Sequence, residues 1–556
     1  MKKIFTIVLL IAVILSCSSC TEIKTINILK QAKKPTEEIQ DIKVGDKLDM
    51  EYATDFTVSN VFSHDMVVQR GEHIRVWGTA PESENGKKIS GEFMGLFAEC
   101  AIENGSWILI FTARLEASCE LGHSMRIYTD TKTVVFEDVL VGDVYMVIGQ
   151  SNVAYSVQKH WSYVKDPERG GTRDVNKEIP IRLHYNSLVH TQGYPKRGTD
   201  EVCPMLLNKS SWEKVTLASV SNFTALGYFF ALEMVELTNS SVPVGIIEID
   251  GNGQPLGAFM CNTVAEQCRT DTYDDISGYH VTTGVNGDAG RYMYNHYIYP
   301  FEKYAIAGIV WYQGESDFAV ANSKVYAKNF SELMTYMRGT HNLINKEFPV
   351  YIIEFPANFD KPKSFVPTND APVWASMDVG LIRATMGSIP QYLSNCYISA
   401  SSDLWYDNTF WNNLHPNCKF EQGVRAARIA ASHLGIIPME EAAGPILKSV
   451  KRSINGKKIV LTYDNVGEGL KTYEGVDYVD GFGIIDSSFN IKGPDTIKLE
   501  ACITSKNQIT ITSSVKITGI VYNYIRYNSF LDGANLCNSN GIPASAVLFV
   551  YVNNTR

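Results

Sequence analysis

Four short polar stretches of this 556-residue chain carry the side chains that could do chemistry. They read G-Q-S-N at 149–152, G-N-G-Q at 251–254, Q-G-E-S at 313–316 and L-H-P at 414–416. Ester cleavage by a serine needs a base for the hydroxyl proton, a group that orients that base, and hydrogen-bond donors for the oxyanion. The four stretches together offer such a set, so acyl transfer is the chemistry that they predict.

The roles follow from the residue types. We assign Ser151 as the nucleophile and His415 as the general base and acid. Backbone N–H groups of Ser151 and Gly253, with the side-chain amide of Gln313, are the expected oxyanion donors. Each stretch alone also fits a structural role: a capping serine, plain turn glycines, a capping signal or a surface histidine. Four such stretches at predicted strand ends are less easily explained by structure.

The stretch 139–156 organises the region that must position these residues. Its first ten residues are almost all apolar or β-branched, which is typical of a strand buried on both faces of a parallel sheet. Gly149 permits a tight turn after that strand. We expect a helix to begin at Ser151, where free backbone N–H groups and the helix dipole favour a developing anion.

Strands alternate with helices through residues 139–440, which predicts a parallel, flavodoxin-like α/β sheet with its ligands at the carboxyl ends of the strands. We expect strands at 139–148, 242–249, 306–312, 350–355 and 395–401, and helices at 223–237, 324–345 and 420–434. Residues 158–222 are polar and irregular, and they predict long loops over the sheet.

The chain is too long for one core, so several domains are expected. Short alternating segments separated by turn residues predict an N-terminal β domain at 56–138. The same pattern returns after Gly444-Pro445 and predicts a C-terminal β domain at 441–556. Both would be sandwich-like and would flank the α/β domain at 139–440.

Composition excludes some partners. The net charge of −10 argues against a nucleic-acid partner, which would need a basic face. Beyond the two cysteines near the N-terminus, nine are scattered without a C-x-x-C pair. Free buried thiols or an occasional disulfide fit that spacing better than a zinc site, so we predict no structural metal.

The N-terminus carries an export pattern. A basic start is followed by an apolar run at 4–15 and by S-C-S-S-C at 16–20, too short for a mature transmembrane helix. The pattern resembles a bacterial lipobox with Cys17 as the lipidated residue; Cys20 and a plain cleaved signal at 1–20 are the alternatives. Residues 21–55 would be a tether, and the protein would be exported to the periplasm or outer-membrane surface, held to the membrane only by its lipid.

The motifs in combination resemble the sialate O-acetylesterase family of the SGNH hydrolases. Three motifs near the expected site carry the similarity: G-Q-S-N, W-Y-Q-G-E-S at 311–316 and H-P…K…G-x-R at 415–425. The similarity extends from about 60 to 550. It includes D-M-V-V-Q-R at 65–70, V-W-G-T-A at 76–80, V-P-V-G at 242–245 and G-I-P-A-S at 541–545. The resemblance implies removal of O-acetyl groups from sugars, without metal or cofactor, through an acetyl-serine. It also implies supporting roles for Gln150, Asn152 and Glu315.

Three departures from the family pattern affect the expected site. Val153 replaces a methionine, and Asn252 replaces the first of two glycines, so only Gly253 is carried over as a donor. Asn412 stands three residues before the histidine, where these hydrolases commonly have the aspartate that orients it.

The orienter of His415 is therefore open. Asp403, just past a predicted strand end, matches the family's strand-end aspartate and is our substitute, with Asp407 in reserve. Glu315 could also support the histidine, and a dyad without a carboxylate is the remaining alternative.

Arg383 matches a family arginine near the site that could meet a sugar carboxylate; a surface helix arginine is the alternative. The expected substrate is an O-acetylated glycan. Sialic acid comes first and acetylated xylan second. A glycan-binding lipoprotein that has lost turnover is the competing hypothesis, motivated by Asn412 and Asn252. A lipase is disfavoured, because no long apolar lid segment is present.

Overall fold

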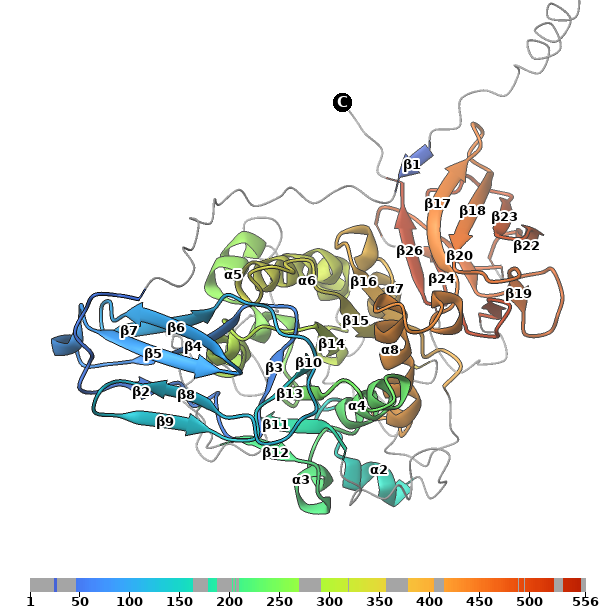
Figure 1. Ribbon diagram of the computed structural model, residues 1–556. Helices are drawn as coiled ribbons and strands as arrows, with labels where there is room; N and C mark the ends of the chain where they lie inside the picture. The colour runs from blue at the N-terminus through green and yellow to red at the C-terminus, as the bar shows by residue number, and fades with distance from the viewer. Residues whose placement is uncertain are drawn as a thin grey trace, which may run out of the picture.

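The computed structural model describes residues 25–27, 47–163, 179–187, 203, 206, 210–269, 292–318, 320–356, 379–404, 415–488, 490–494, 496–524 and 534–551 (Figure 1). The predicted lipidation residue Cys17 and the alternative Cys20 lie outside these residues, as do Asp407 and Asn412.

The centre of the fold is β10 (Leu140–Gly149), all ten residues of which are buried. It lies between β13 (Val244–Asp250) and β14 (Gly308–Tyr312), and both pair with it in parallel. These three strands confirm the predicted runs at 139–148, 242–249 and 306–312. The apolar, β-branched composition of these strands agrees with their central position, because a strand covered on both faces has no side exposed to water.

The sheet continues on both sides of this centre. Its order is β12-β11-β13-β10-β14-β15-β16, with β3 (Val67–Gln69) also paired in parallel with β10. The added strands are β11 (Ile181–Ser187), β12 (Trp212–Lys214), β15 (Val350–Ile353) and β16 (Cys396–Ser399). Among the described strands of this sheet, only the edge pair β11–β12 is antiparallel. The predicted parallel α/β sheet is thus present.

The prediction of loops throughout 158–222 is wrong. β11 lies inside the sheet and pairs with β13 in register over its whole length. Its sequence, I-R-L-H-Y-N-S, does not predict a buried strand, because polar residues alternate with the apolar ones. In the structure Arg182 and His184 are nevertheless both buried. His184 packs edge-on against Trp212 and Phe301, and burial lowers its pKa to about 3, so the ring is a neutral core aromatic.

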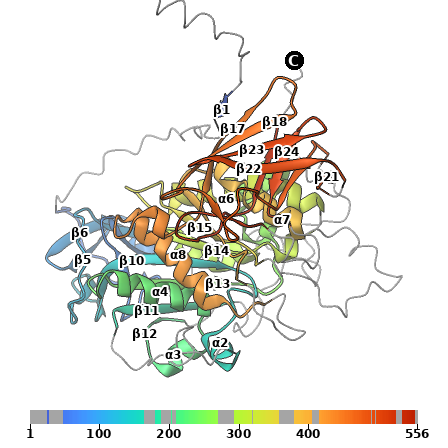
Figure 2. The same cartoon turned by 90° about the vertical axis from the view of Figure 1, so that its right-hand side faces the viewer.

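Helices cover the sheet. α4 (Ala225–Leu237), α6 (Val320–Thr340) and α8 (Lys419–His433) confirm the three predicted helices to within a few residues. Shorter helices are α2 (Val157–Tyr163), α3 (Leu217–Ser221), α5 (Asn262–Arg269) and α7 (Val379–Met386). Figure 2 shows α4 and α8 side by side; a Cβ at Gly423 of α8 would lie 2.8 Å from the Leu226 carbonyl oxygen, so glycine permits this close approach.

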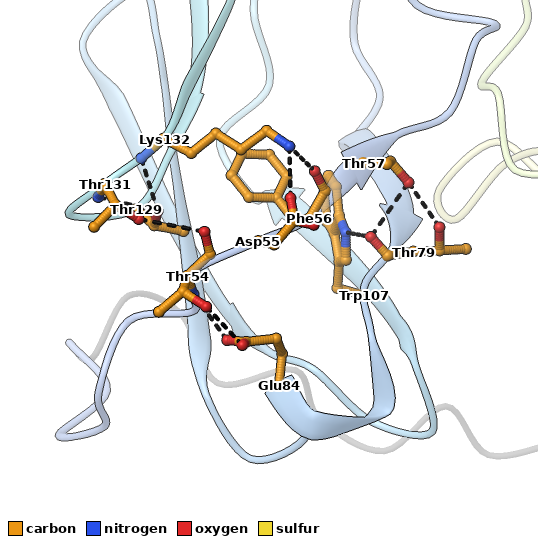
Figure 3. A network of polar contacts seen from close by, with 10 residues as sticks. All are labelled: Thr54, Asp55, Phe56, Thr57, Thr79, Glu84, Trp107, Thr129, Thr131 and Lys132. Carbon is orange, nitrogen blue, oxygen red and sulfur yellow. Dashed lines mark hydrogen bonds and ion pairs between the residues drawn. The ribbon is translucent and has the colours of Figure 1, made fainter.

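The strands before β10 are antiparallel, apart from β3, which confirms the β character predicted for 56–138. One set is β2 (Thr57–Val58), β4 (Ile74–Thr79) and β7 (Ser106–Phe111); the other is β6 (Leu96–Ala101), β5 (Lys88–Phe93), β8 (Met125–Tyr128) and β9 (Thr133–Phe136). Polar contacts join their connections (Figure 3): Lys132 Nζ donates to Asp55 Oδ1 at 2.7 Å, and Thr54 Oγ1 donates to Glu84 Oε1 at 2.7 Å. Buried side chains form one continuous cluster from Ala53 to Ala443, so these strands pack directly on the α/β region.

The strands after residue 445 form antiparallel sheets around a second buried cluster. β17 (Ile446–Arg452), β18 (Lys458–Asp464), β23 (Gln508–Ser513) and β22 (Leu499–Ser505) make one sheet, to which β1 (Thr25–Asn27) adds. β21 (Ile491–Lys492), β20 (Phe482–Ile485), β24 (Gly519–Tyr522) and β26 (Val547–Val550) make another, and β19 (Lys471–Thr472) pairs with β25 (Leu536–Cys537). The return to β structure is as predicted.

Three further observations concern only the part of the chain described above. No helix in it is both long enough and apolar enough to span a bilayer. The nine cysteines in it are free thiols. No group of three or more His, Cys, Asp or Glu side chains in it is arranged to hold a metal ion.

The close packing of β10 can be tested at Gly142. A Cβ there would lie 2.1 Å from the Pro243 carbonyl oxygen, so Gly142→Ala must push β10 away from the segment that precedes β13. We expect a loss of about 3 kcal/mol in the free energy of unfolding, measured by denaturant titration. Gly339→Ala is the control, because a Cβ there meets nothing within 4 Å and alanine favours the helix. Equal stability of the two variants would contradict this packing.

Candidate active site

The site begins where β10 ends. A Cβ on Gly149 would lie 2.0 Å from the Tyr312 carbonyl oxygen, so only glycine lets the ends of β10 and β14 approach this closely. Gly251, just past β13, donates its backbone N–H to the Gly149 carbonyl at 3.0 Å. The chain segments that follow β10, β13 and β14 therefore leave the sheet together at one edge.

Ser151 lies in the turn that follows, and the prediction of a helix beginning there is wrong. Val153 and Ala154 donate their N–H groups to the Gln150 carbonyl at 2.9 and 3.0 Å, which makes a single turn. α2 begins only at Val157. The reason is tertiary: residues 155–157 pair with residues 223–225, so the backbone there is extended and interrupts the helix. The Ser151 side chain is half-buried.

His415 lies beside Ser151. The distance between His415 Nε2 and Ser151 Oγ is 2.8 Å, across 264 positions of sequence. This is hydrogen-bond length for a hydroxyl and a ring nitrogen. The structure thus brings together the two residues on which the predicted chemistry depends.

The surroundings of the imidazole favour its neutral form. Burial, together with the nearby cations of Lys419 and Lys159, lowers the pKa of His415 to about 4. The ring is therefore uncharged at neutral pH. An uncharged ring with its lone pair at Nε2 can accept the serine proton.

Asp403 does not orient His415 in this structure. Its carboxylate accepts from Arg425 Nη1 at 2.6 Å and from Nη2 at 2.7 Å, and Nη1 also donates to the Ala400 carbonyl. Among the described residues no hydrogen bond joins Asp403 to the imidazole. The carboxylate instead ties the end of β16 to α8. Asp407, the reserve orienter, lies outside the described residues.

Gln313 is likewise placed differently from the prediction. Its Nε2 donates to Asp317 Oδ2 at 2.7 Å and to the Gln254 carbonyl at 3.1 Å, and its Oε1 accepts from Tyr326 Oη at 2.9 Å. The side chain is fully buried. Both amide hydrogens are thus engaged away from Ser151. Gln313 joins the loops after β13 and β14, and it does not act as the expected oxyanion donor.

Asn152 and Glu315 join the loops after β10 and β14. Asn152 Nδ2 donates to Glu315 Oε1 at 2.5 Å, and burial raises the pKa of Glu315 to about 7. Gln150 lies in the same cluster, where its side-chain amide, oriented to satisfy its neighbours, donates to Glu315 Oε2 at 3.1 Å and to the Gln254 carbonyl at 3.2 Å. The three predicted supporting residues thus lie together. The carboxylate of Glu315 contacts Asn152, not the His415 imidazole that was its alternative partner.

Gly253 lies in the turn after β13. Its φ is +68°, a conformation that favours glycine, and Gln254 donates its N–H to the Gly251 carbonyl at 3.2 Å. Asn252 is exposed beside it. Because Asp250 pairs with Gly149, this turn begins directly next to the Ser151 turn.

Arg383 is not a surface residue and does not face the site. It is 1% exposed; its Nη2 donates to Asn523 Oδ1 at 3.2 Å, and its Nε lies 3.8 Å from Glu354 Oε1. Glu354 also accepts backbone N–H groups from Ser401 and Ala546. The predicted substrate contact is therefore wrong: this pair joins α7 and β15 to the C-terminal strands.

Sequence reasoning gave no role to Lys419, which is fully buried next to the imidazole. Its Nζ donates to the Pro416 carbonyl at 2.7 Å. The signal was present as the lysine of H-P…K, at a fixed spacing from His415. A buried lysine at the first residue of α8 was not expected, because lysine is seldom fully buried.

Serine and imidazole within hydrogen-bond reach, at the carboxyl edge of a parallel sheet, are the arrangement that serine–histidine ester hydrolases use. The family described as "Carbohydrate esterase, sialic acid-specific acetylesterase" matches residues 141–384. The resemblance to the sialate O-acetylesterase family that the motifs predicted is thus confirmed over this part of the chain.

Individual relatives are distant. The chain is 22% identical to human sialate O-acetylesterase over 304 residues, an alignment that covers 52% of each chain. It is 23% identical to rat sialate O-acetylesterase over 379 residues, an alignment that covers 60% of this chain and 64% of the rat protein. The match thus spans about half the length of the human relative. A crystal structure of a carbohydrate acetylesterase from Xanthomonas citri has the same fold, with a TM-score of 0.64 at 21% identity over 89% of this chain and 99% of that one.

The buried position of Arg383 makes a prediction. Arg383→Met leaves Glu354 charged and buried without its guanidinium, and we expect a loss of about 3–5 kcal/mol in the free energy of unfolding. The KM of the folded fraction should stay unchanged. Arg126→Met is the control, because that exposed ion pair should contribute less than about 1 kcal/mol. A raised KM at unchanged stability would instead support substrate binding by Arg383.

Proposed function

We propose that this protein is a serine esterase that removes O-acetyl groups from carbohydrates, with O-acetylated sialic acid as its first expected substrate. The observation that carries the proposal is the 2.8 Å contact between His415 Nε2 and Ser151 Oγ. The match of residues 141–384 to a carbohydrate esterase family supports it.

In the first step His415 Nε2 takes the proton of Ser151 as Oγ attacks the acetyl carbonyl carbon. The oxyanion is stabilised by the backbone N–H groups of Ser151 and Gly253. When the intermediate collapses, the bond from the carbonyl carbon to the sugar oxygen breaks. His415 returns its proton to that oxygen, so the sugar leaves as an alcohol and the acetyl group remains on Ser151.

In the second step a water molecule replaces the sugar. His415 takes one proton from the water as its oxygen attacks the acetyl-serine carbonyl. Collapse of the second oxyanion breaks the ester to Ser151 and releases acetic acid, while the imidazole returns the proton to Oγ. No redox partner is required, and the neutral imidazole at physiological pH is the form that both steps use.

The choice of sugar rests on the relatives. The human and rat relatives are sialate O-acetylesterases, and the neighbour from Xanthomonas citri is a carbohydrate acetylesterase. Acetylated xylan is the second substrate class. Because Arg383 is buried away from the site, a sialic acid carboxylate would have to be met by other residues.

The architecture and compartment complete the proposal. We infer an SGNH-type α/β domain at 139–440, flanked by β-sandwich-like domains at 56–138 and 441–556. We also infer an exported lipoprotein that is held to the membrane only by its lipid, with a signal at 1–20 and lipid on Cys17. The predicted tether at 21–55 is wrong in part, because Thr25–Asn27 pairs with β17 and Ala53 belongs to the buried core. The support for export is the basic start and apolar run of the sequence.

The nucleophile is tested by Ser151→Ala. Acetate release from O-acetylated sialosides, xylans and mannans should fall by at least about 10³-fold, because the acetyl-serine cannot form. Ser156→Ala, in the same chain segment, is the matched control and should keep full activity. Full activity in the Ser151 variant would refute the mechanism. Glycan binding by the wild type without acetate release would favour the competing hypothesis of a binding protein that has lost turnover.

The anchor is tested by Cys17→Ala in a bacterial host. The wild type should incorporate labelled fatty acid and sediment with membranes, whereas the variant should lose the label. Cys20→Ala is the matched control and should keep it. Label that depends on Cys20, or no label at all, would contradict lipidation at Cys17.

A further inference from the structure

Lys419 is the buried charge of this site that the proposed mechanism does not use. The side chain is 0% exposed, and its Nζ donates to the Pro416 carbonyl at 2.7 Å. Burying an ammonium group costs free energy unless its surroundings compensate. A cation kept in such a place therefore calls for a physical account.

The surroundings of the ammonium come from three separate chain segments. Its Nζ lies 5.0 Å from the ring centre of Tyr155 and 5.2 Å from that of Tyr312. Tyr155 belongs to the segment that begins with Ser151, and Tyr312 is the last residue of β14. Pro416 follows His415 directly. The Lys419 ammonium thus contacts the chain segment that carries Ser151, the segment that carries His415, and the end of β14.

We propose that Lys419 is the positioning residue of the catalytic pair, holding the His415 segment against the Ser151 segment through the Pro416 carbonyl and the two tyrosine rings. The inference rests on the proposed function. Asp403 was expected to hold His415 in place, but its carboxylate is bound to Arg425. In this proposal Lys419 supplies that restraint. Cation–π contacts strengthen where water is excluded, so two of them help to hold a short segment in place.

The charges around the pair set the expected pH behaviour. His415 faces the cations of Lys419 and Lys159. Lys419 itself faces Glu315, Cys418 and Lys159, and burial lowers its pKa to about 8. Its charge opposes formation of the imidazolium. Removing it should raise the pKa of His415 and move the acid limb of activity to higher pH, because the base must be neutral to act.

Lys419→Met is the decisive variant. Methionine keeps the apolar stem and removes the ammonium, and replacing a buried charge by an apolar side chain of similar volume is often neutral or stabilising. We expect unfolding to be unchanged or shifted to higher temperature, while kcat falls by about 10²-fold with KM changed by less than about threefold, as for a misplaced catalytic pair. A purely structural lysine would give the reverse, a loss of stability with normal kcat.

Lys159→Met separates charge from contact. Lys159 is exposed on α2, and its Nζ lies 4.9 Å from the Tyr155 ring centre, so this variant removes a cation near His415 but leaves the Pro416 contact. It should move the acid limb in the same direction with kcat nearly unchanged. An equal loss of kcat in both lysine variants would show that charge alone acts, and would overturn the positioning role.

A second readout keeps this test independent of the substrate. The rate at which a fluorophosphonate labels Ser151 measures activation of the hydroxyl by His415 without any acetylated sugar. It should fall by about 10²-fold in Lys419→Met and stay near the wild-type rate in Lys159→Met. Equal labelling of Lys419→Met and wild type overturns the inference. Normal labelling of the wild type without acetate release from any sugar would refute the proposed function alone.

Discussion

The structure depends on the parallel pairing of β10 with β13 on one side and β14 on the other. All ten residues of β10 are buried, so each of its backbone polar groups needs a partner within the sheet. Parallel register then brings the carboxyl ends of the three strands to one edge, with Gly149 opposite Asp250 and Tyr312. Glycine at 149 allows this, because any side chain there would meet the Tyr312 carbonyl.

Polar contacts between the loops convert that strand alignment into a rigid edge. Asp317 Oδ2 accepts from Gln313 Nε2 and from the Leu256 backbone N–H, which joins the loop after β14 to the loop after β13. Asn152 and Glu315 join the loops after β10 and β14 in the same way. The polar residues around Ser151 thus serve mostly to fix backbone positions, and the reacting groups are few.

What the sequence could predict follows from the range of the interactions involved. The strands β10, β13 and β14, and the pair Ser151 and His415, were predictable because apolar runs and strand-end motifs are local signals. β11 was missed because Arg182 and His184 face the interior, where only tertiary packing makes them acceptable. Gln313, Asp403 and Arg383 were correctly noticed but given the wrong partners. Their partners Asp317, Arg425 and Glu354 are chosen by the three-dimensional arrangement, which residue type does not encode.

The central claim is that an acetyl group passes through Ser151. The direct measurement is to mix the protein with excess O-acetylated sugar, quench in acid during turnover, and map the peptides by mass spectrometry. The account predicts one acetyl group on the peptide that contains Ser151, with the modification on that residue, and none on the same peptide of a His415→Ala variant. Rapid acetate release with no acetyl group on Ser151, or with acetyl on a different side chain, would contradict it.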